Sequence, residues 1–236
     1  MATLRTLLGV FASPGRTLAL VAEQRRVVAP LLVAVAASLS FSAAFVPRVD
    51  WERAALRKIE DQGGQMTPHE REEEVAQVRK LGAVTGYGAA ALGPVLGALA
   101  AAFFLWMGFR VAGTRPAFLP ALAVTAWALL PVQLGRLLAI PAVVRADGLL
   151  PDGLSRLLPW NGAYWLPPGA AAPAASAASS LDLFGLWSVA LLAIGMAVVA
   201  GASLRRSAAV VVVLWLAVVA AGMAAASAAA PGPWNA

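Results

Sequence analysis

Five long apolar segments dominate the sequence and limit the folds that the chain can adopt. They cover residues 27–46, 83–109, 117–144, 181–202 and 207–229. Each is long enough to cross roughly 30 Å of hydrocarbon as a helix, which takes about 20 residues. Because every backbone N–H and C=O must be satisfied within such a layer, these segments are expected to be helical. The sequence therefore predicts an all-α, polytopic membrane protein whose five-helix transmembrane bundle covers residues 27–229.

The overall composition agrees with a protein whose solvent is lipid. Hydrophobic residues make up 60% of the 236 residues and charged residues 13%, whereas a soluble domain carries about 25% charged residues. A soluble core of this size could not bury so much apolar surface. The formal net charge of +6 comes from short basic clusters beside the apolar segments, where anionic lipid headgroups are the expected partner. We therefore expect a lipid bilayer as the main partner and no nucleic acid.

Basic residues decide the expected orientation of the spans. With the N-terminus inside, the cytoplasmic pieces are residues 1–26, 110–116 and 203–206. Together these pieces carry one acid, Glu23, and eight arginines: Arg5, Arg16, Arg25, Arg26, Arg110, Arg115, Arg205 and Arg206. The outside pieces hold nine basic residues over about twice that length, so charge density rather than raw count favours this arrangement. The prediction is a cytoplasmic N-terminus and an outside C-terminus.

Residues 1–26 are predicted to form a short amphipathic segment. Four apolar residues recur at the spacing of one helix face: Leu4, Leu7, Leu8 and Phe11. Ser13 followed by Pro14 is a suitable cap and first turn for a second short helix. One interpretation is a helix lying in the cytoplasmic interface, held there by Arg5 and Arg16. The other is ordinary packing under the bundle, and the sequence does not separate the two.

Residues 47–81 form the one strongly charged stretch and are expected outside the membrane. Thr67-Pro68-His69-Glu70 has the spacing of a capping box, which predicts a helix that begins at Pro68. No helix breaker follows before Leu81, so this helix is expected to run directly into the second span. A shorter helix over Trp51–Asp61 would complete a charged helical hairpin.

The segment 145–180 separates the third and fourth spans. It is rich in Pro, Gly, Ala and Ser, which is typical of an irregular loop. Because it is weakly apolar rather than charged, we expect it to lie against the membrane surface.

The residue inventory excludes the common kinds of active site. The chain has no cysteine, and its single histidine, His69, lies in the charged stretch, away from the depth where an intramembrane serine would need a base. A two-aspartate site fails as well, since only Asp182 lies near a span. His69 with Glu72 or Glu73 supplies two metal ligands without a third. We therefore predict no catalytic, cofactor-binding or metal-ligating residues, and no enzyme.

The second span carries small residues at helical spacing. Gly82 and Gly86 form one small-xxx-small pair, and Gly93 and Gly97 form another. Such pairs let helices approach closely in lipid. They predict either an interface with a second copy or another membrane protein, or packing within the bundle. Pro94 is expected to kink this helix.

Polar residues within the spans are few. Apart from serine and threonine, the conspicuous ones are Gln133 and Arg136 in the third span and Asp182 at the start of the fourth. Intramembrane polar residues are functional candidates by default. The third span ends and the fourth begins on the same side, so we hypothesise that Arg136 pairs with Asp182 as a structural salt bridge toward the outer leaflet. The alternative is a path for a solute or lipid near these three residues.

Several short motifs resemble the bacterial branch of the Yip domain family, whose eukaryotic members bind Rab (Ypt) GTPases. The motifs are Leu8-Gly-Val-Phe-Ala-Ser-Pro14, Phe45-Val-Pro-Arg-Val-Asp-Trp51-Glu52, Ala126-Trp-Ala-Leu-Leu-Pro131, Leu181-Asp-Leu-Phe-Gly-Leu-Trp187-Ser188 and Ile194-Gly195. They occur in order along nearly the whole chain and add Pro131 and Trp187 to the candidate residues. The resemblance implies five spans, a cytoplasmic N-terminus, the bacterial inner membrane and no enzymatic activity. GTPase binding is not carried over, because only 26 residues precede the first span.

These observations leave two function classes. The first is a non-enzymatic membrane scaffold or adaptor, favoured because the spans hold so few polar residues. The alternative is a transporter or lipid-handling protein with a path near Gln133, Arg136 and Asp182, which would require a polar cavity that reaches the middle of the membrane.

Overall fold

The computed structural model describes residues 2–61, 67–151 and 153–229, and the described residues are helical without any strand. The helices are α1 Ala2–Ala12, α2 Pro14–Gln24, α3 Val28–Phe45, α4 Trp51–Asp61, α5 Pro68–Val111, α6 Phe118–Ala128, α7 Leu130–Arg145, α8 Leu154–Leu157, α9 Ala172–Ser179, α10 Leu183–Ala200 and α11 Leu204–Ala229, with short 3₁₀ turns η1 Val46–Arg48 and η2 Gly162–Trp165. Five helical stretches in the described part are long and apolar enough to cross a membrane. The predicted fold class is therefore confirmed.

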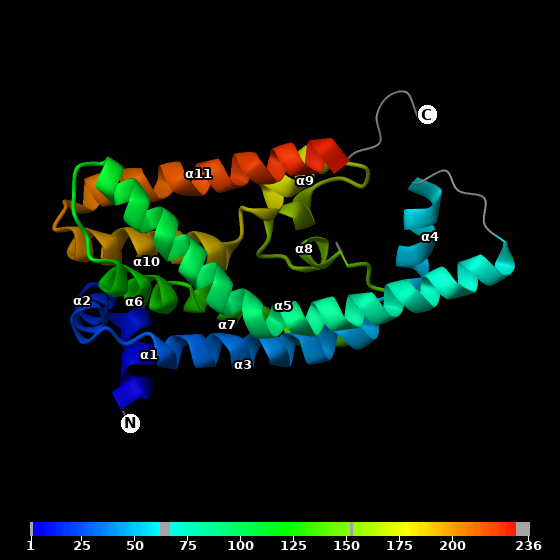
Figure 1. The fold of residues 1–236 in the computed structure, drawn as a ribbon, viewed down its shortest axis with the longest axis horizontal. Helices are drawn as coiled ribbons and strands as arrows, with labels where there is room; N and C mark the ends of the chain where they lie inside the picture. Colours follow the sequence, from blue (N-terminus) through cyan, green and yellow to red (C-terminus); the bar gives the residue numbers. More distant parts are fainter. Residues whose placement is uncertain (1, 62–66, 152, 230–236) are drawn as a thin grey trace.

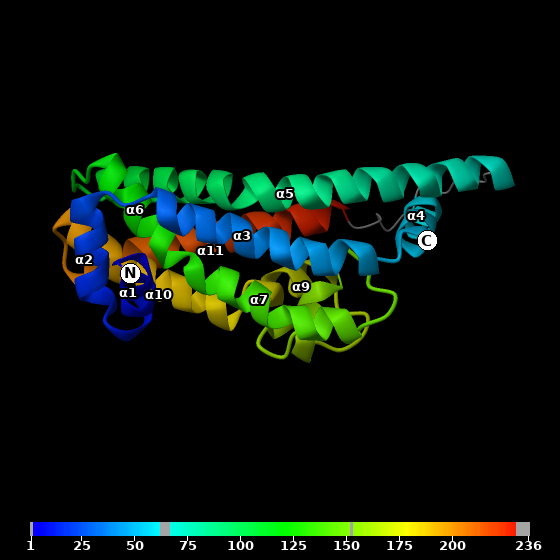
Figure 2. The ribbon, with the colours of Figure 1, turned by 90° about the horizontal axis from the view of Figure 1, so that it is seen from below.

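The spans run side by side along the long axis of the molecule (Figures 1 and 2). The first span, α3, packs against α5 and α7, and α10 packs against α11, α6 and α7. The two N-terminal helices, the α5–α6 connection and the α10–α11 connection gather at one end of the bundle, while α4 and the start of α5 lie at the other. We call the first of these the basic end, because Arg16, Arg25, Arg26, Arg115, Arg205 and Arg206 lie exposed there.

The second span begins far outside the bundle. Thr67 caps α5: its side chain accepts from the backbone N–H of Glu70, and the Glu70 carboxylate accepts from the backbone N–H of Thr67 at 2.8 Å. The predicted capping box and the uninterrupted helix from Pro68 are thus confirmed. Figure 1 shows α4 beside this projecting part of α5 and a change of direction further along α5. Pro94 is the proline inside α5, and its missing N–H and ring account for such a bend.

The third span is broken into two helices. Leu129 separates α6 from α7, and Pro131 stands in the first turn of α7. Because proline cannot donate to the carbonyl four residues earlier, the helix restarts at this point. Pro131 is almost fully buried, so the break lies inside the bundle.

The main core lies at the basic end. Its fully buried side chains come from α1, α2, α5, α6 and α10, and include Val10, Leu18, Phe109, Trp127 and Met196. The indole of Trp127 also donates to the carbonyl of Arg26 at 2.8 Å. Helix α2 therefore packs under the bundle, and its Leu18 and Val21 are wholly inaccessible to solvent. In contrast, Leu8 on α1 is 63% exposed, so this face of α1 is not covered by the bundle.

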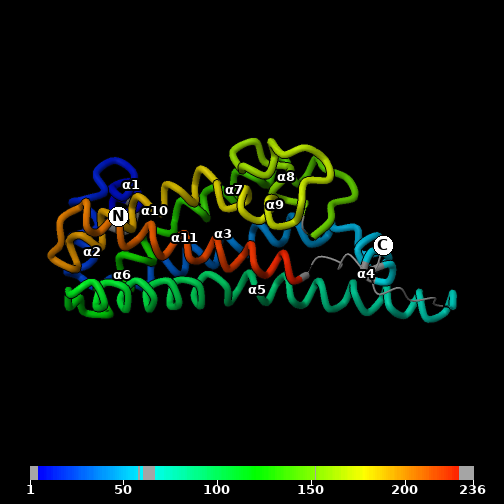
Figure 3. The backbone as a smooth tube through the Cα atoms, turned by 90° about the horizontal axis from the view of Figure 1, so that it is seen from above, coloured from blue at the N-terminus to red at the C-terminus, as the bar shows by residue number. Residues whose placement is uncertain are grey.

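The segment between α7 and α10 folds back beside the spans. Figure 3 shows it as a compact lobe to one side of the bundle. Helix α9 packs along α11, where a Cβ added at Gly222 would lie 3.2 Å from the Ser176 hydroxyl. Phe41 and Val143 form a second core with Leu149 and Leu158 of this segment. Where the sequence predicts an irregular loop, the segment forms two short helices, α8 and α9, within a packed lobe; its position against the membrane surface stays a prediction.

Candidate functional site

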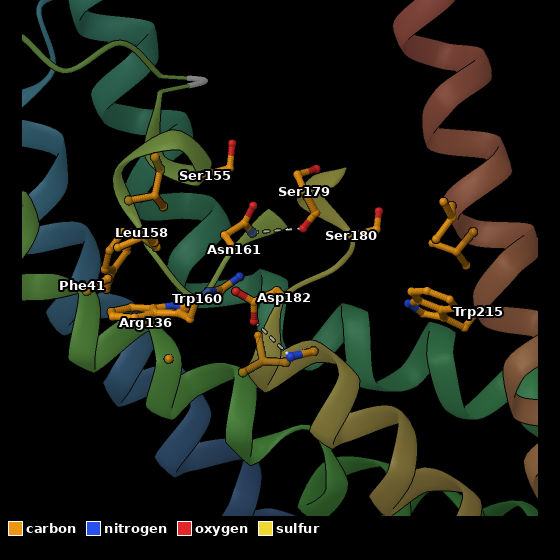
Figure 4. Close-up of a pocket in the computed structure, with 17 residues that line it drawn as sticks. Phe41, Arg136, Ser155, Leu158, Trp160, Asn161, Ser179, Ser180, Asp182 and Trp215 are labelled. Carbon is orange, nitrogen blue, oxygen red and sulfur yellow. Dashed lines mark hydrogen bonds between the residues drawn. The ribbon is translucent and has the colours of Figure 1, made fainter. Parts of the chain in front are cut away.

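A cavity of about 370 Å³ lies where the lobe meets α3, α7, α10 and α11. Figure 4 shows its polar lining: Arg136 from α7, Asp182 at the start of α10, and Ser155, Asn161, Ser179 and Ser180 from the lobe. Its aromatic and apolar lining includes Phe41, Leu158, Trp160 and Trp215. The cavity therefore gathers two of the three intramembrane polar residues that the sequence singles out.

Arg136 reaches from α7 to the first span. Its Nη1 donates to the hydroxyl of Ser38 at 3.2 Å and to the Oε1 of Gln133 at 3.3 Å. Gln133 is three residues earlier on the same helix, on the same face. Both acceptors are neutral, and no carboxylate among the described residues lies within ion-pair distance of the guanidinium. The cation is thus held in place by hydrogen bonds without being neutralised.

Asp182 caps the fourth span. Its Oδ1 accepts from the backbone N–H groups of Phe184 and Gly185, both at 3.0 Å, as expected of an aspartate before a helix. The other oxygen, Oδ2, makes no hydrogen bond to a described residue. The predicted ion pair with Arg136 is therefore absent from the described structure, although both residues line one cavity. The physical reason is that each side chain has another partner. Arg136 donates to Ser38 on α3, and Asp182 accepts from the first backbone N–H groups of α10.

Asn161 organises the wall of the cavity that the lobe supplies. Its Nδ2 donates to the carbonyl of Ser179 at 3.1 Å, and its Oδ1 accepts from the backbone N–H of Ala163 at 2.9 Å. Backbone bonds from Gly162 to Leu181 and from Leu183 to Trp160 tie the lobe to the start of α10. Asn161 and Ser38 are not among the candidate residues that the sequence predicts. Ser38 could have been chosen as a candidate because it is a polar residue in the middle of an apolar span. For Asn161 the sequence offers only its position in a loop of small residues, which is weak evidence for a site.

The small residues of the second span divide into two groups. A Cβ added at Gly82 would lie 2.1 Å from the ring of Trp51, and one at Gly86 would lie 2.9 Å from Val46. Those glycines allow α4 and η1 to approach α5. A Cβ at Gly93 or Gly97 would meet nothing within 4 Å.

The second glycine pair lines a cavity. Gly93, Pro94 and Gly97 face a second space of about 340 Å³, which Gln133 and Arg136 also line. Close helix packing within the chain therefore explains Gly82 and Gly86, whereas Gly93 and Gly97 lie beside an opening between α3, α5 and α7.

Trp187 connects the fourth span to the N-terminus. Its ring meets that of Phe11 edge-to-face, with centroids 4.9 Å apart. Trp187 does not line the cavity at Arg136, although Gly185, two residues earlier on α10, does. Trp187 therefore positions α1 rather than contributing to that cavity.

The described residues offer no group of three potential metal ligands. His69 pairs with Glu73 at 3.4 Å, and both side chains are largely exposed on the projecting part of α5. This pair lies on the solvated face of a charged helix, and neither residue lines the hollow of about 580 Å³ between α4 and the start of α5. The chemistry that the cavity at Arg136 can perform is recognition through one cation, one carboxylate oxygen and several neutral polar groups.

Comparison with known protein families gives one match. The sequence model of the Yip1 domain matches residues 8–226, which is nearly the whole chain. This match confirms the resemblance to the Yip domain family that the motifs indicate. Neither a curated protein nor a solved structure matches the chain.

Proposed function

Because the chain belongs to the Yip1 domain family, whose members are not known as enzymes, we propose that it is a non-enzymatic membrane scaffold or adaptor. The observation that carries this proposal is the separation of two charged surfaces by five spans. At one end lie the exposed arginines of the basic end, and at the other lie α4 and the start of α5, the two helices of the predicted charged hairpin. A scaffold needs two such surfaces, each able to hold a different partner.

The basic end is proposed to face the cytoplasm of a bacterial cell, against anionic headgroups of the inner membrane. The arginines there lie in α2, in the connections that follow α2 and α5, and in the first turn of α11. Arg206 of α11 donates to the carbonyl of Ala112 at the end of α5, which ties these two helix ends together. Short cytoplasmic loops rich in arginine are the main determinant of orientation. Each basic side chain near an anionic surface contributes about 1 kcal/mol to attraction. The C-terminus then lies outside.

Labelling of engineered cysteines tests this orientation, because the chain has no cysteine of its own. In His69→Cys the thiol is expected to react with a membrane-impermeant maleimide added to intact spheroplasts. In Arg115→Cys, which lies at the basic end, it is expected to react only after the membrane is opened. The opposite pattern would overturn the orientation.

The hairpin is the proposed contact for a protein partner. Arg71 and Glu72 are exposed on the part of α5 that projects beyond the bundle. A photo-crosslinking amino acid at either position is expected to give discrete protein adducts in native membranes. The matched control is Leu216, which is 51% exposed on α11 and is expected to crosslink to lipid. If the hairpin gives no adduct and the purified protein moves a solute or lipid across liposomes, the scaffold role is wrong.

A further inference from the structure

The cavity at Arg136 extends from about half-way through the bundle toward the end opposite the basic end, because Asp182 directly precedes α10 and stands 18 residues, or about 27 Å, from Ala200. Ser38, which accepts from Arg136, is ten residues beyond Val28, or about 15 Å along α3. Trp215, on the opposite wall, is eleven residues beyond Leu204, or about 16 Å along α11. Both spans begin at the basic end. A ligand at this depth has to be a component of the membrane or to enter through the protein.

The two charges of this cavity do not neutralise one another. Arg136 is bonded only to neutral oxygens, and Asp182 Oδ2 is free of any bond to a described residue. Both side chains are only partly buried, and a hydrogen-bonded partner of opposite charge offsets part of the cost of placing either charge in an apolar environment. The cavity therefore presents one cation and one anion that remain available to a ligand.

The walls of the cavity differ in polarity. Asn161, Ser179 and Ser180 supply polar groups on the side of the lobe, while Trp215 and Val219 supply an apolar wall on α11. The outer face of α11 is apolar and exposed, with Val218 at 69%, and no other span in the described part of the chain covers it. A ligand with a polar head and an apolar tail fits this division, because its tail can follow α11 into the lipid. The volume is in the range of small-molecule sites.

We propose that this cavity binds the headgroup of a zwitterionic phospholipid bearing a primary ammonium group. The phosphate contacts the Arg136 guanidinium, which is suited to phosphate oxygens. The ammonium contacts Asp182 Oδ2. A headgroup with only negative charge would satisfy Arg136 and be repelled by Asp182, and an uncharged headgroup would leave both unpaired. The site stands apart from the scaffold role, which rests on the two ends of the bundle.

Native mass spectrometry of the detergent-purified protein tests the proposal, with added phosphatidylethanolamine or phosphatidylglycerol as probes. The wild-type chain is expected to bind phosphatidylethanolamine more tightly. Arg136→Gln keeps a hydrogen-bonding side chain and loses the charge, so binding of both lipids should weaken by about tenfold or more. Arg145→Gln, at the exposed end of the same helix, removes an equal charge and should leave binding unchanged.

Asp182→Asn gives an independent result. Asparagine caps helices as well as aspartate does, so its Oδ1 should keep the bonds to Phe184 and Gly185 and the fold should be retained. The preference for phosphatidylethanolamine over phosphatidylglycerol is expected to disappear while phosphatidylglycerol binding rises. Equal binding of the two lipids by the wild-type chain, unchanged selectivity in Asp182→Asn, or wild-type binding by folded Arg136→Gln would each overturn the proposal.

Discussion

The indole Nε1 of Trp127 donates a hydrogen bond to the carbonyl oxygen of Arg26 at 2.8 Å. Arg26 stands where the N-terminal helices give way to the first span, and Trp127 is 1% exposed in the main core. One side chain of the third span thus fixes the entry of the chain into the membrane. The backbone at Arg25 has a positive φ of 52°, so the turn before this point is tightly constrained as well.

Trp127→Phe is expected to loosen the N-terminal helices. The substitution keeps an aromatic ring and removes the donor, so the free energy of unfolding should fall by about 1 kcal/mol, with a further loss from the smaller ring. Thermal unfolding in detergent and the rate of tryptic cleavage at Arg25 and Arg26 would both report it. Trp165→Phe is the control, because Trp165 is 74% exposed and bonds only to nearby Pro159. Equal effects of the two variants would contradict the role of Trp127.

Gly195→Ala is expected to destabilise the core where α10 meets α6 and α2. A Cβ there would lie 2.3 Å from Val124 Cγ1 and 3.2 Å from Leu18 Cδ1, and overpacking of this kind costs about 1–3 kcal/mol. Gly93→Ala makes the same change in an open position, where a Cβ meets nothing within 4 Å. Its higher helix propensity should leave stability equal or raise it by up to about 1 kcal/mol. The midpoints of thermal unfolding in detergent check this. A lower midpoint for Gly93→Ala than for Gly195→Ala would contradict the close packing at Gly195.

Ser207→Ala is expected to weaken the contact between the last two spans. The Ser207 hydroxyl is fully buried and donates to the carbonyl of Ala193 on α10 at 2.7 Å. Hydrogen bonds between spans contribute about 0.6–1.7 kcal/mol, so the unfolding midpoint should fall measurably. Ser227→Ala serves as the control, since Ser227 is exposed and donates only to Met223 in its own helix. A loss in Ser227→Ala as large as in Ser207→Ala would argue against an interhelical origin.

The start of α5 is expected to lose stability in acid. The backbone N–H of Thr67, followed by its side-chain hydroxyl, holds the pKa of the Glu70 carboxyl below its ordinary value. A lowered pKa means that the capping box stabilises this turn above the ordinary carboxylate range and loses its effect as the pH falls through the pKa of the folded state. Amide exchange in the first turn of α5, corrected for intrinsic rates, should show this loss. In Glu70→Gln the protection should not change with pH over that range, and a parallel loss there would disprove the assignment.

The sequence by itself determined the features that depend on residues close together in the chain, namely the helical spans, the capping box and the choice of polar candidates. Five apolar segments of bilayer length can satisfy their backbones only as helices, and the structure has five such stretches. The capping box at Thr67 was equally readable, because it joins residues three apart. Gln133, Arg136 and Asp182 could be chosen as candidates because a polar residue is conspicuous within an apolar segment.

The partners of those residues were decided only by the tertiary structure. A segment that is apolar on every side carries no periodicity, so the sequence does not say which face meets a neighbour. The rotation of α7 that brings Arg136 to Ser38, rather than to Asp182, follows from packing across three spans. Tertiary packing also distinguishes Gly82 from Gly93, although both begin a similar small-xxx-small pair in the sequence. A Cβ at Gly82 would collide with Trp51, whereas a Cβ at Gly93 would meet nothing within 4 Å. The lobe between α7 and α10 depends on bonds between residues far apart, such as Asn161 to Ser179, and long-range pairing of this kind leaves no local pattern to read.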